Sequence, residues 1–304
     1  MSSFAPTTIT FQKRFKRRSL AYWFRKIWAL LWLIRFIPSS AATLAFLAGL
    51  RLSNATLNIE GTSFGFVSTF LVTSGCSAWN DYWDQKEDGI NVPYRPLSSG
   101  VLPVGVALSY SAIAFTVTAL LTSAMGVKAF VFYGGASLAS LVYSPLIKPL
   151  PVAKTSFVAL FCASLVIFGG YVGGNIGATI EVAMIVIVSV AGREILIDIH
   201  DMSGDALVGH KTLPLIVGIP VSRYLVSILL WVTVFLQLRF MMSSAFSYLS
   251  TLSLLASILC FLSVSVVVVG RSVLPKRRLL FLIRILMVGI FLGLGSAILR
   301  QSNA

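Results

Sequence analysis

Acidic residues are scarce in this chain of 304 residues, which has ten Asp and Glu against 24 Lys and Arg. Charged residues make up 11% of the sequence and hydrophobic residues 57%, whereas about a quarter of the residues of a soluble domain are charged. The composition therefore excludes an ordinary soluble protein. It predicts an all-α, polytopic integral membrane protein.

Cysteine and histidine are nearly absent as well. Cys76, Cys162 and Cys260 are scattered through apolar stretches without C-x-x-C spacing, which predicts small buried hydrophobic side chains and no disulfide framework. The two histidines, His200 and His210, have no cysteine or further histidine near them. Their oxygen-rich surroundings favour carboxylate ligands over histidine ligands for any metal.

Nine apolar stretches approach the ~20 residues that are needed to span a bilayer. They predict nine transmembrane helices, at residues 28–50, 64–79, 102–124, 127–142, 156–173, 180–197, 222–240, 246–270 and 279–299. We therefore expect one transmembrane domain over residues 27–304, preceded by a basic cytoplasmic arm over residues 1–26. The arm's composition suits contact with anionic lipid headgroups, and an organelle transit peptide is the alternative.

The net charge of +14 could indicate a nucleic-acid partner, but its distribution favours membrane topology instead. With the N-terminus in the cytoplasm and the spans alternating, eighteen basic residues fall on the cytoplasmic side. Four fall on the opposite side: Arg51, Lys128, Arg239 and Arg300. This is a strong positive-inside pattern. It places the N-terminus and both acidic motifs in the cytoplasm, or in the stroma or matrix of an organelle, and we expect membrane lipid but no nucleic acid as a partner.

Eight of the ten acids lie in two short stretches, at residues 80–100 (NDYWDQKEDGINVPYRPLSSG) and 193–205 (REILIDIHDMSGD). Each stretch holds three aspartates at i, i+3 and i+7, which share one face of a helix. They are Asp81, Asp84 and Asp88, and Asp198, Asp201 and Asp205. Stacked carboxylates repel one another, and all-oxygen ligands suit a hard cation such as Mg²⁺. The pattern predicts two acidic faces that hold Mg²⁺ and together bind a diphosphate.

Several basic residues lie on the same side of the membrane as these acids. Arg95, held between Pro93 and Pro96, is suited to bidentate contact with phosphate oxygens. Lys148 is either a diphosphate contact or a topology anchor, and Lys211 is a second candidate phosphate contact. Arg35, inside the first apolar run, is either functional or simply extends to the membrane surface.

The two acidic motifs are 117 residues apart, an offset of four predicted spans. This offset predicts an internal duplication of a four-helix unit, with a ninth helix appended.

The motifs NDxxDxxxD, INxPxRPxxSG, YSxxxK and DxxDxxGDxxxGxxTLP occur in this order, and the sequence resembles the UbiA superfamily of intramembrane prenyltransferases over most of its length. The segment INVPYRPLSSG is most similar to the chlorophyll-synthase and archaeal-lipid branches. The resemblance implies nine helices around a central cavity, with both motifs binding a prenyl diphosphate through Mg²⁺. It departs from the pattern at Lys154–Ser156, where members often have an Asn.

Carried over residue by residue, the resemblance assigns the metal to six aspartates: Asp81, Asp84, Asp88, Asp198, Asp201 and Asp205. Asp81, Asp84 and Asp201 are the expected catalytic residues. The expected substrate-binding residues are Asn80, Arg95, Tyr143, Lys148 and Lys211.

The implied activity is Mg²⁺-dependent transfer of a prenyl group from an isoprenyl diphosphate to an aromatic or other lipophilic acceptor. Positive charge stabilises the leaving diphosphate, and a site that excludes water protects the allylic cation. A membrane terpene cyclase that uses the same donor without an acceptor is the main alternative. A transporter with internal repeats is the third reading, because charged residues in spans also mark ion pathways.

Overall fold

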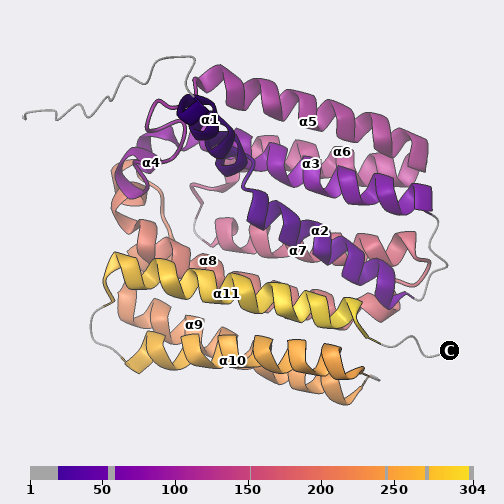
Figure 1. Ribbon diagram of the computed structural model, residues 1–304. Coiled ribbons are helices and arrows are strands. Elements are labelled where there is room, and N and C mark those ends of the chain that lie inside the picture. The colour runs from indigo at the N-terminus through magenta and orange to yellow at the C-terminus, as the bar shows by residue number, and fades with distance from the viewer. Residues whose placement is uncertain (1–19, 54–58, 151, 244–245, 271–273, 301–304) are drawn as a thin grey trace, which may run out of the picture.

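The computed structural model describes residues 20–53, 59–150, 152–243, 246–270 and 274–300, and these residues form helices and no strands. The long helices lie side by side along one direction (Figure 1). In chain order the helices are α1 (Leu20–Leu33), α2 (Phe36–Leu52), α3 (Ile59–Trp83), α4 (Gln85–Asn91), α5 (Val104–Met125), α6 (Val127–Val142), α7 (Ala153–Val172), α8 (Ile180–Leu207), α9 (Leu213–Met242), α10 (Tyr248–Gly270) and α11 (Lys276–Ile298). A π-helical turn, Tyr143–Ile147, extends α6.

Six of the described helices are long and apolar enough to cross a membrane, and the bent pair α1–α2 would make a seventh span. The six are α5, α6 with its π-helical turn, α7, α9, α10 and α11. The chain is therefore an integral, multi-pass membrane protein. Helices α3 and α8 are 25 and 28 residues long and fall outside this set. Helix α3 ends within the first acidic motif, and α8 carries the second motif near its end. The nine spans and the four-helix repeat stay predictions.

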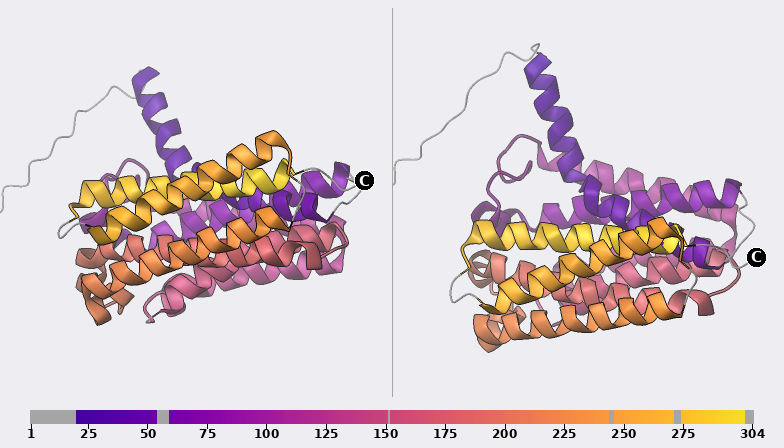
Figure 2. Two further views of the ribbon diagram at one scale, coloured as in Figure 1. Left: turned by 90° about the horizontal axis from the view of Figure 1, so that it is seen from below. Right: turned by 60° about the horizontal axis from the view of Figure 1, so that its bottom comes forward.

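The apolar run predicted as one helix over residues 28–50 is broken in the structure. Arg35 has left-handed backbone angles (φ 44°, ψ 57°), which residues other than glycine seldom adopt. Helices α1 and α2 consequently meet at a 43° bend, and α1 projects from the bundle (Figure 2). The bend places Arg35 at a junction between helices, and its side chain reaches α3.

Close backbone contact holds α2 against α7. A Cβ atom at Gly49 would lie 1.9 Å from the carbonyl oxygen of Val166, and one at Gly169 would lie 2.1 Å from that of Phe46. Such small residues let helix backbones approach closely within a bilayer. Helix α8 packs on α7 and helix α11 on α2, and α9 and α10 pack on α8 and α11 around the main apolar core, while α3, α5 and α6 form a second layer. The three cysteines are free, and they are half-buried where the sequence predicted buried side chains.

The fold brings the ends of the two acid-bearing helices together. Helices α3 and α8 both finish at the end of the bundle where α4 lies (Figure 1), and α4 packs directly on α8. Two sequence segments far apart in the chain therefore share one end of an apolar bundle.

Candidate active site

The first acidic motif lies across the junction of α3 and α4. Asp81 is in the last turn of α3, Asp84 is the N-cap of α4, and Glu87 and Asp88 are in the first turn of α4. All four side chains are buried. Burying carboxylates is costly unless they are paired or bind a cation.

Basic side chains supply that pairing. Arg35 Nη2 lies 2.7 Å from Asp81 Oδ1, and Arg95 Nη1 lies 3.2 Å from the same oxygen and 2.6 Å from Asp88 Oδ2. Lys148 Nζ lies 2.5 Å from Asp84 Oδ1 and also contacts Glu87 Oε1. The structure thus brings Arg95 and Lys148 to the first motif.

Burial and charge oppose each other at these carboxylates. Burial raises the pKa of Asp84 to about 7, although the Lys148 ammonium acts to lower it and the carboxylates of Glu87 and Asp88 raise it further. Burial also raises the pKa of Asp88, against the opposing charge of Arg95. Both acids therefore hold their negative charge less firmly than a solvent-exposed aspartate does.

The second acidic motif lies in the last three turns of α8. Asp198 and Asp205 are buried, and Asp201 is partly exposed. Lys154 Nζ, from the start of α7, lies 2.5 Å from Asp198 Oδ1, and His200 Nδ1 lies 2.5 Å from Asp201 Oδ1. Lys154, which marks a departure from the UbiA pattern, is therefore an ion-pair partner of a proposed metal ligand.

Asn91 joins the two motifs. Its side-chain amide donates to the Asp201 carbonyl oxygen at 2.8 Å and accepts from the Gly204 N–H at 3.0 Å. A Cβ atom at Gly204 would lie 2.2 Å from Asn91 Nδ2 and 2.8 Å from the Glu87 carbonyl oxygen. Glycine at this position therefore allows α4 to sit against α8.

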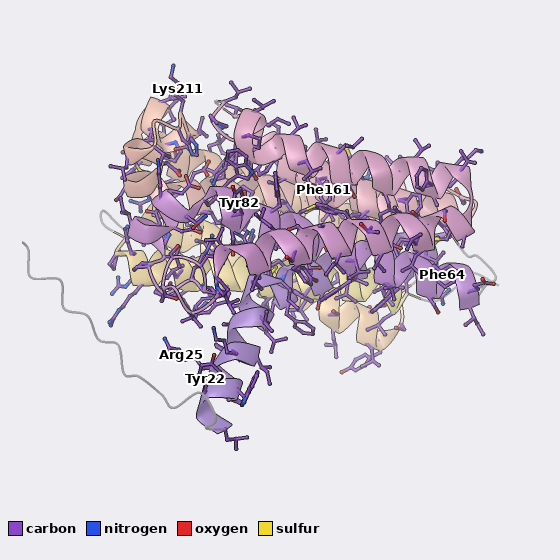
Figure 3. All side chains as sticks on the ribbon, turned by 90° about the horizontal axis from the view of Figure 1, so that it is seen from above. Tyr22, Arg25, Phe64, Tyr82, Phe161 and Lys211 are labelled. Atoms are coloured by element: carbon purple, nitrogen blue, oxygen red, sulfur yellow. The ribbon has the colours of Figure 1, made fainter. Side chains whose placement is uncertain are left out.

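The remaining candidate residues differ in their placement. Asn80 Oδ1 accepts a hydrogen bond of 2.9 Å from Ser144 Oγ. Tyr143 is buried and stacks on Phe157 with ring centroids 4.6 Å apart, and its carbonyl oxygen accepts from the Lys148 N–H. This π-helical turn positions Lys148 beside Asp84. Lys211, by contrast, is exposed and points away from the helices (Figure 3).

Five residues near the acids have roles that sequence reasoning left open or missed: Arg35, Glu87, Asn91, Lys154 and His210. Asn91 stands in the INxP motif, which is a signal for it. Glu87 lies one residue from Asp88 but outside the i, i+3, i+7 pattern, so the spacing could not single it out. Arg35 and Lys154 come from α2 and α7, and only the tertiary fold reveals their partners.

The ligand atoms of the two acidic motifs suit a hard cation. Ligand atoms of the six aspartates are all carboxylate oxygens, the type that Mg²⁺ prefers. Asp205 Oδ2 is buried without a hydrogen-bond partner, and Glu87 Oε2, between the motifs, lies 3.1 Å from His210 Nδ1. An unpaired buried carboxylate oxygen such as Asp205 Oδ2 fits a bound cation.

One cavity lies away from the acids. Residues of α8 to α11 line it, among them Val186, Gln237, Phe261 and Gly293. Its walls are mainly apolar and include none of the acidic residues. The central cavity at the acidic motifs stays a prediction.

Fold and site define an integral membrane protein with a charged, oxygen-rich site at one end of an apolar helix bundle. The sequence profile of the UbiA prenyltransferase family matches residues 35–288, and the chain belongs to this family. The resemblance expected from the motifs is confirmed.

Relatives include archaeal enzymes named digeranylgeranylglyceryl phosphate synthase. The one from Pyrococcus abyssi (strain GE5 / Orsay) is 35% identical over 161 residues, which is 53% of this chain and 58% of the relative. The one from Methanothrix thermoacetophila is 30% identical over 194 residues, 64% of this chain and 73% of the relative. The match thus spans little more than half the length of the Pyrococcus relative.

Solved structures share the fold. A UbiA homologue from Archaeoglobus fulgidus bound to GPP and Mg²⁺ has a TM-score of 0.65 at 21% identity, over 88% of this chain and 99% of that chain. The apo structure of a UbiA homologue from Aeropyrum pernix K1 has a TM-score of 0.71 at 16% identity, over 85% of this chain and 97% of that chain.

Proposed function

We propose that this protein transfers a prenyl group from an isoprenyl diphosphate to a lipophilic acceptor within the membrane, in a Mg²⁺-dependent reaction. The observation that carries the proposal is the meeting of both acidic motifs, with their basic partners, at one end of an apolar bundle. Arg35, Arg95, Lys148 and Lys154 all reach carboxylates there. Membership of the UbiA prenyltransferase family supports the same activity.

The basic side chains bind the diphosphate in this proposal. Arg95 presents a planar guanidinium that can contact two phosphate oxygens at once, and Lys148 supplies a point charge. Both already neutralise carboxylates, so diphosphate oxygens compete with Asp81, Asp84 and Asp88 for them. Asn80 and Tyr143 flank this region from α3 and the π-helical turn, and Lys211 requires a change of side-chain direction to reach it.

The aspartates hold the metal. The proposed ligands are Asp81, Asp84, Asp88, Asp198, Asp201 and Asp205, of which Asp81, Asp84 and Asp201 are the expected catalytic residues. Bound Mg²⁺ would supply Lewis-acid stabilisation of the leaving diphosphate. The chain itself orients the donor and keeps water from the allylic centre with apolar helix faces.

The name of the relatives indicates which acceptor molecule to test first. Because they are named digeranylgeranylglyceryl phosphate synthase, we propose geranylgeranylglyceryl phosphate as the first acceptor to test and geranylgeranyl diphosphate as its donor. The positive-inside pattern supports a cytoplasmic location for this end of the bundle.

The test is an assay of the purified full chain in lipid nanodiscs with labelled geranylgeranyl diphosphate and Mg²⁺. The panel contains geranylgeranylglyceryl phosphate, an aromatic acceptor and no acceptor. A labelled product that forms only with an acceptor is expected. A cyclised hydrocarbon or alcohol from the donor alone would favour the terpene cyclase instead, and no consumption of the donor would contradict both activities.

A further inference from the structure

A second set of ligand atoms lies between the two acidic motifs. Glu87, Asp205 and His210 each offer one atom, and these atoms all lie within 4.8 Å of one another. Glu87 and His210 are not among the aspartates at i, i+3 and i+7 spacing. The set therefore differs in composition from the Mg²⁺ ligands proposed above and shares only Asp205 with them.

Local backbone structure brings His210 to Asp205. Helix α8 ends at Leu207, and Gly209 follows with φ 77°. The N–H of His210 donates to the Asp205 carbonyl oxygen at 2.9 Å, and the N–H of Gly209 donates to that of Ala206 at 3.3 Å. These two bonds form a Schellman motif, which requires a left-handed residue such as glycine. The motif turns His210 back toward the last turn of α8.

Helix α4 brings in Glu87. The hydrogen bonds of Asn91 to Asp201 and Gly204 hold α4 on α8, and Lys148 occupies Oε1 of Glu87. The other oxygen, Oε2, is left facing His210, whose Nδ1 lies 3.1 Å away. That nitrogen is also 4.0 Å from Asp205 Oδ1.

Where the three side chains converge, one oxygen of Asp205 has no partner. Asp205 Oδ2 is buried and has no hydrogen-bond partner, whereas Glu87 Oε2 and His210 Nδ1 are buried 3.1 Å apart. The side chains of Glu87 and Asp205 are 7% and 3% exposed. Buried polar atoms without partners are rare in native proteins, and each calls for an explanation such as a bound ion. A cation at this place would give Asp205 Oδ2 a partner, with Glu87 and His210 as its other ligands.

We propose that Glu87, Asp205 and His210 bind a divalent transition-metal ion such as Zn²⁺ or Co²⁺. An imidazole nitrogen suits these ions, whereas Mg²⁺ prefers oxygen ligands alone. Three protein ligands leave a coordination position open. The ion links α4 to the end of α8 and needs no diphosphate, so the proposal does not depend on the prenyltransferase activity.

The chain's two histidines allow a matched experiment. Metal-free full-length protein in detergent is titrated with Co²⁺ in the presence of excess Mg²⁺, and bound Co²⁺ is measured by elemental analysis and visible absorption. Wild type and His200→Gln are expected to bind one Co²⁺ each. His210→Gln should bind it more than ~100-fold more weakly, because losing a group that only orients a metal ligand already costs about 10–100-fold.

Equal Co²⁺ binding by His210→Gln and wild type would overturn the proposal, as would no Co²⁺ retained by wild type in excess Mg²⁺. A second measurement uses wild-type protein, so its outcome does not depend on whether the His210→Gln variant folds. In protein labelled with ¹⁵N-histidine, one equivalent of Zn²⁺ should shift the His210 ring signals and leave those of His200 in place. Unchanged His210 signals would also overturn the proposal. Neither measurement uses a prenyl diphosphate, so failure here is distinguishable from failure of the proposed function.

Discussion

Buried charged side chains at this site form ion pairs, so the effect of replacing one side chain depends on the charged partner that remains. Lys148 contacts both Asp84 and Glu87, so it keeps one carboxylate when the other is neutralised. Removing the charge of Asp84 should therefore impair chemistry more than folding.

Asp84→Asn and Asp201→Asn are each expected to lower kcat by at least ~10²–10³-fold, the loss typical of one missing group that stabilises transition-state charge. Steady-state rates with saturating donor and acceptor measure the effect. Glu60→Gln, at the opposite end of α3, is the control and should turn over at nearly the wild-type rate. A wild-type rate in Asp84→Asn would show that this acid is no part of the reaction.

Arg95→Lys tests which substrate this face of the site contacts. Arg95 bridges Asp81 and Asp88 through one guanidinium nitrogen, and lysine keeps the charge but loses the planar fork. The KM for prenyl diphosphate should rise, or kcat should fall, while the KM for the acceptor changes little. Lys148→Ala should behave likewise. Kinetics with each substrate varied in turn decide the matter, and a defect confined to the acceptor KM would reverse the assignment.

At the residue scale, the sequence predicted which acids would gather but not what they would touch. The i, i+3, i+7 spacing located six aspartates, and the structure places basic side chains beside four of them. Arg35 and Lys154 could not be assigned from the sequence, because each contacts an acid more than 40 residues away. His210 was set aside because no further histidine or cysteine accompanies it, yet its nearest neighbours are buried carboxylates.

At the scale of helices, close contacts between backbones govern the geometry of the site. Apart from residues 28–50, each predicted apolar stretch corresponds to one helix, since apolar length is a local property of the sequence. The break at Arg35 was not predictable from composition, because its left-handed backbone coincides with a long-range contact to Asp81. The contact of α4 with α8 could not be predicted from the sequence either, because it depends on position 204 being a glycine, which has no side chain.

Gly204→Ala is expected to destabilise the protein and to separate α4 from α8. Helix propensity alone would make alanine more stable than glycine by about 1 kcal/mol. The new Cβ, however, would lie 2.2 Å from Asn91 Nδ2 and 2.8 Å from the backbone of Glu87, and such overpacking typically costs ~1–3 kcal/mol. The midpoint of thermal unfolding in detergent should fall.

Gly89→Ala is the matched control, since Gly89 lies in α4 and a Cβ there meets nothing within 4 Å. Its unfolding midpoint should stay the same or rise. If both variants are equally stable, the close approach of α4 and α8 is not a constraint on this fold.

At the scale of the whole molecule, charge is distributed in a way that apolar packing alone does not explain. Eight of the ten acids lie in two motifs that the fold brings to one end of the bundle (Figure 1). Among the residues that the structure describes, five lysine and arginine side chains pair with acids of these motifs: Arg35, Arg95, Lys148, Lys154 and Arg193. The eight acids outnumber these five partners, so the two motifs hold more carboxylates than paired basic side chains.

A diphosphate brought to these motifs would add further negative charge beside their carboxylates. Like charges at close range repel strongly where the effective dielectric is low, so cations must accompany the donor. We therefore expect turnover to stop in excess EDTA and to return when Mg²⁺ is restored above the chelator. We also expect the affinity for prenyl diphosphate, measured by equilibrium binding, to fall with the metal. The basic residues remain in place without it, so weak binding of the donor should persist at low ionic strength and decline with added salt. Undiminished turnover in EDTA, after dialysis against chelator, would mean that the basic side chains alone carry the leaving group and that the six aspartates have a structural role.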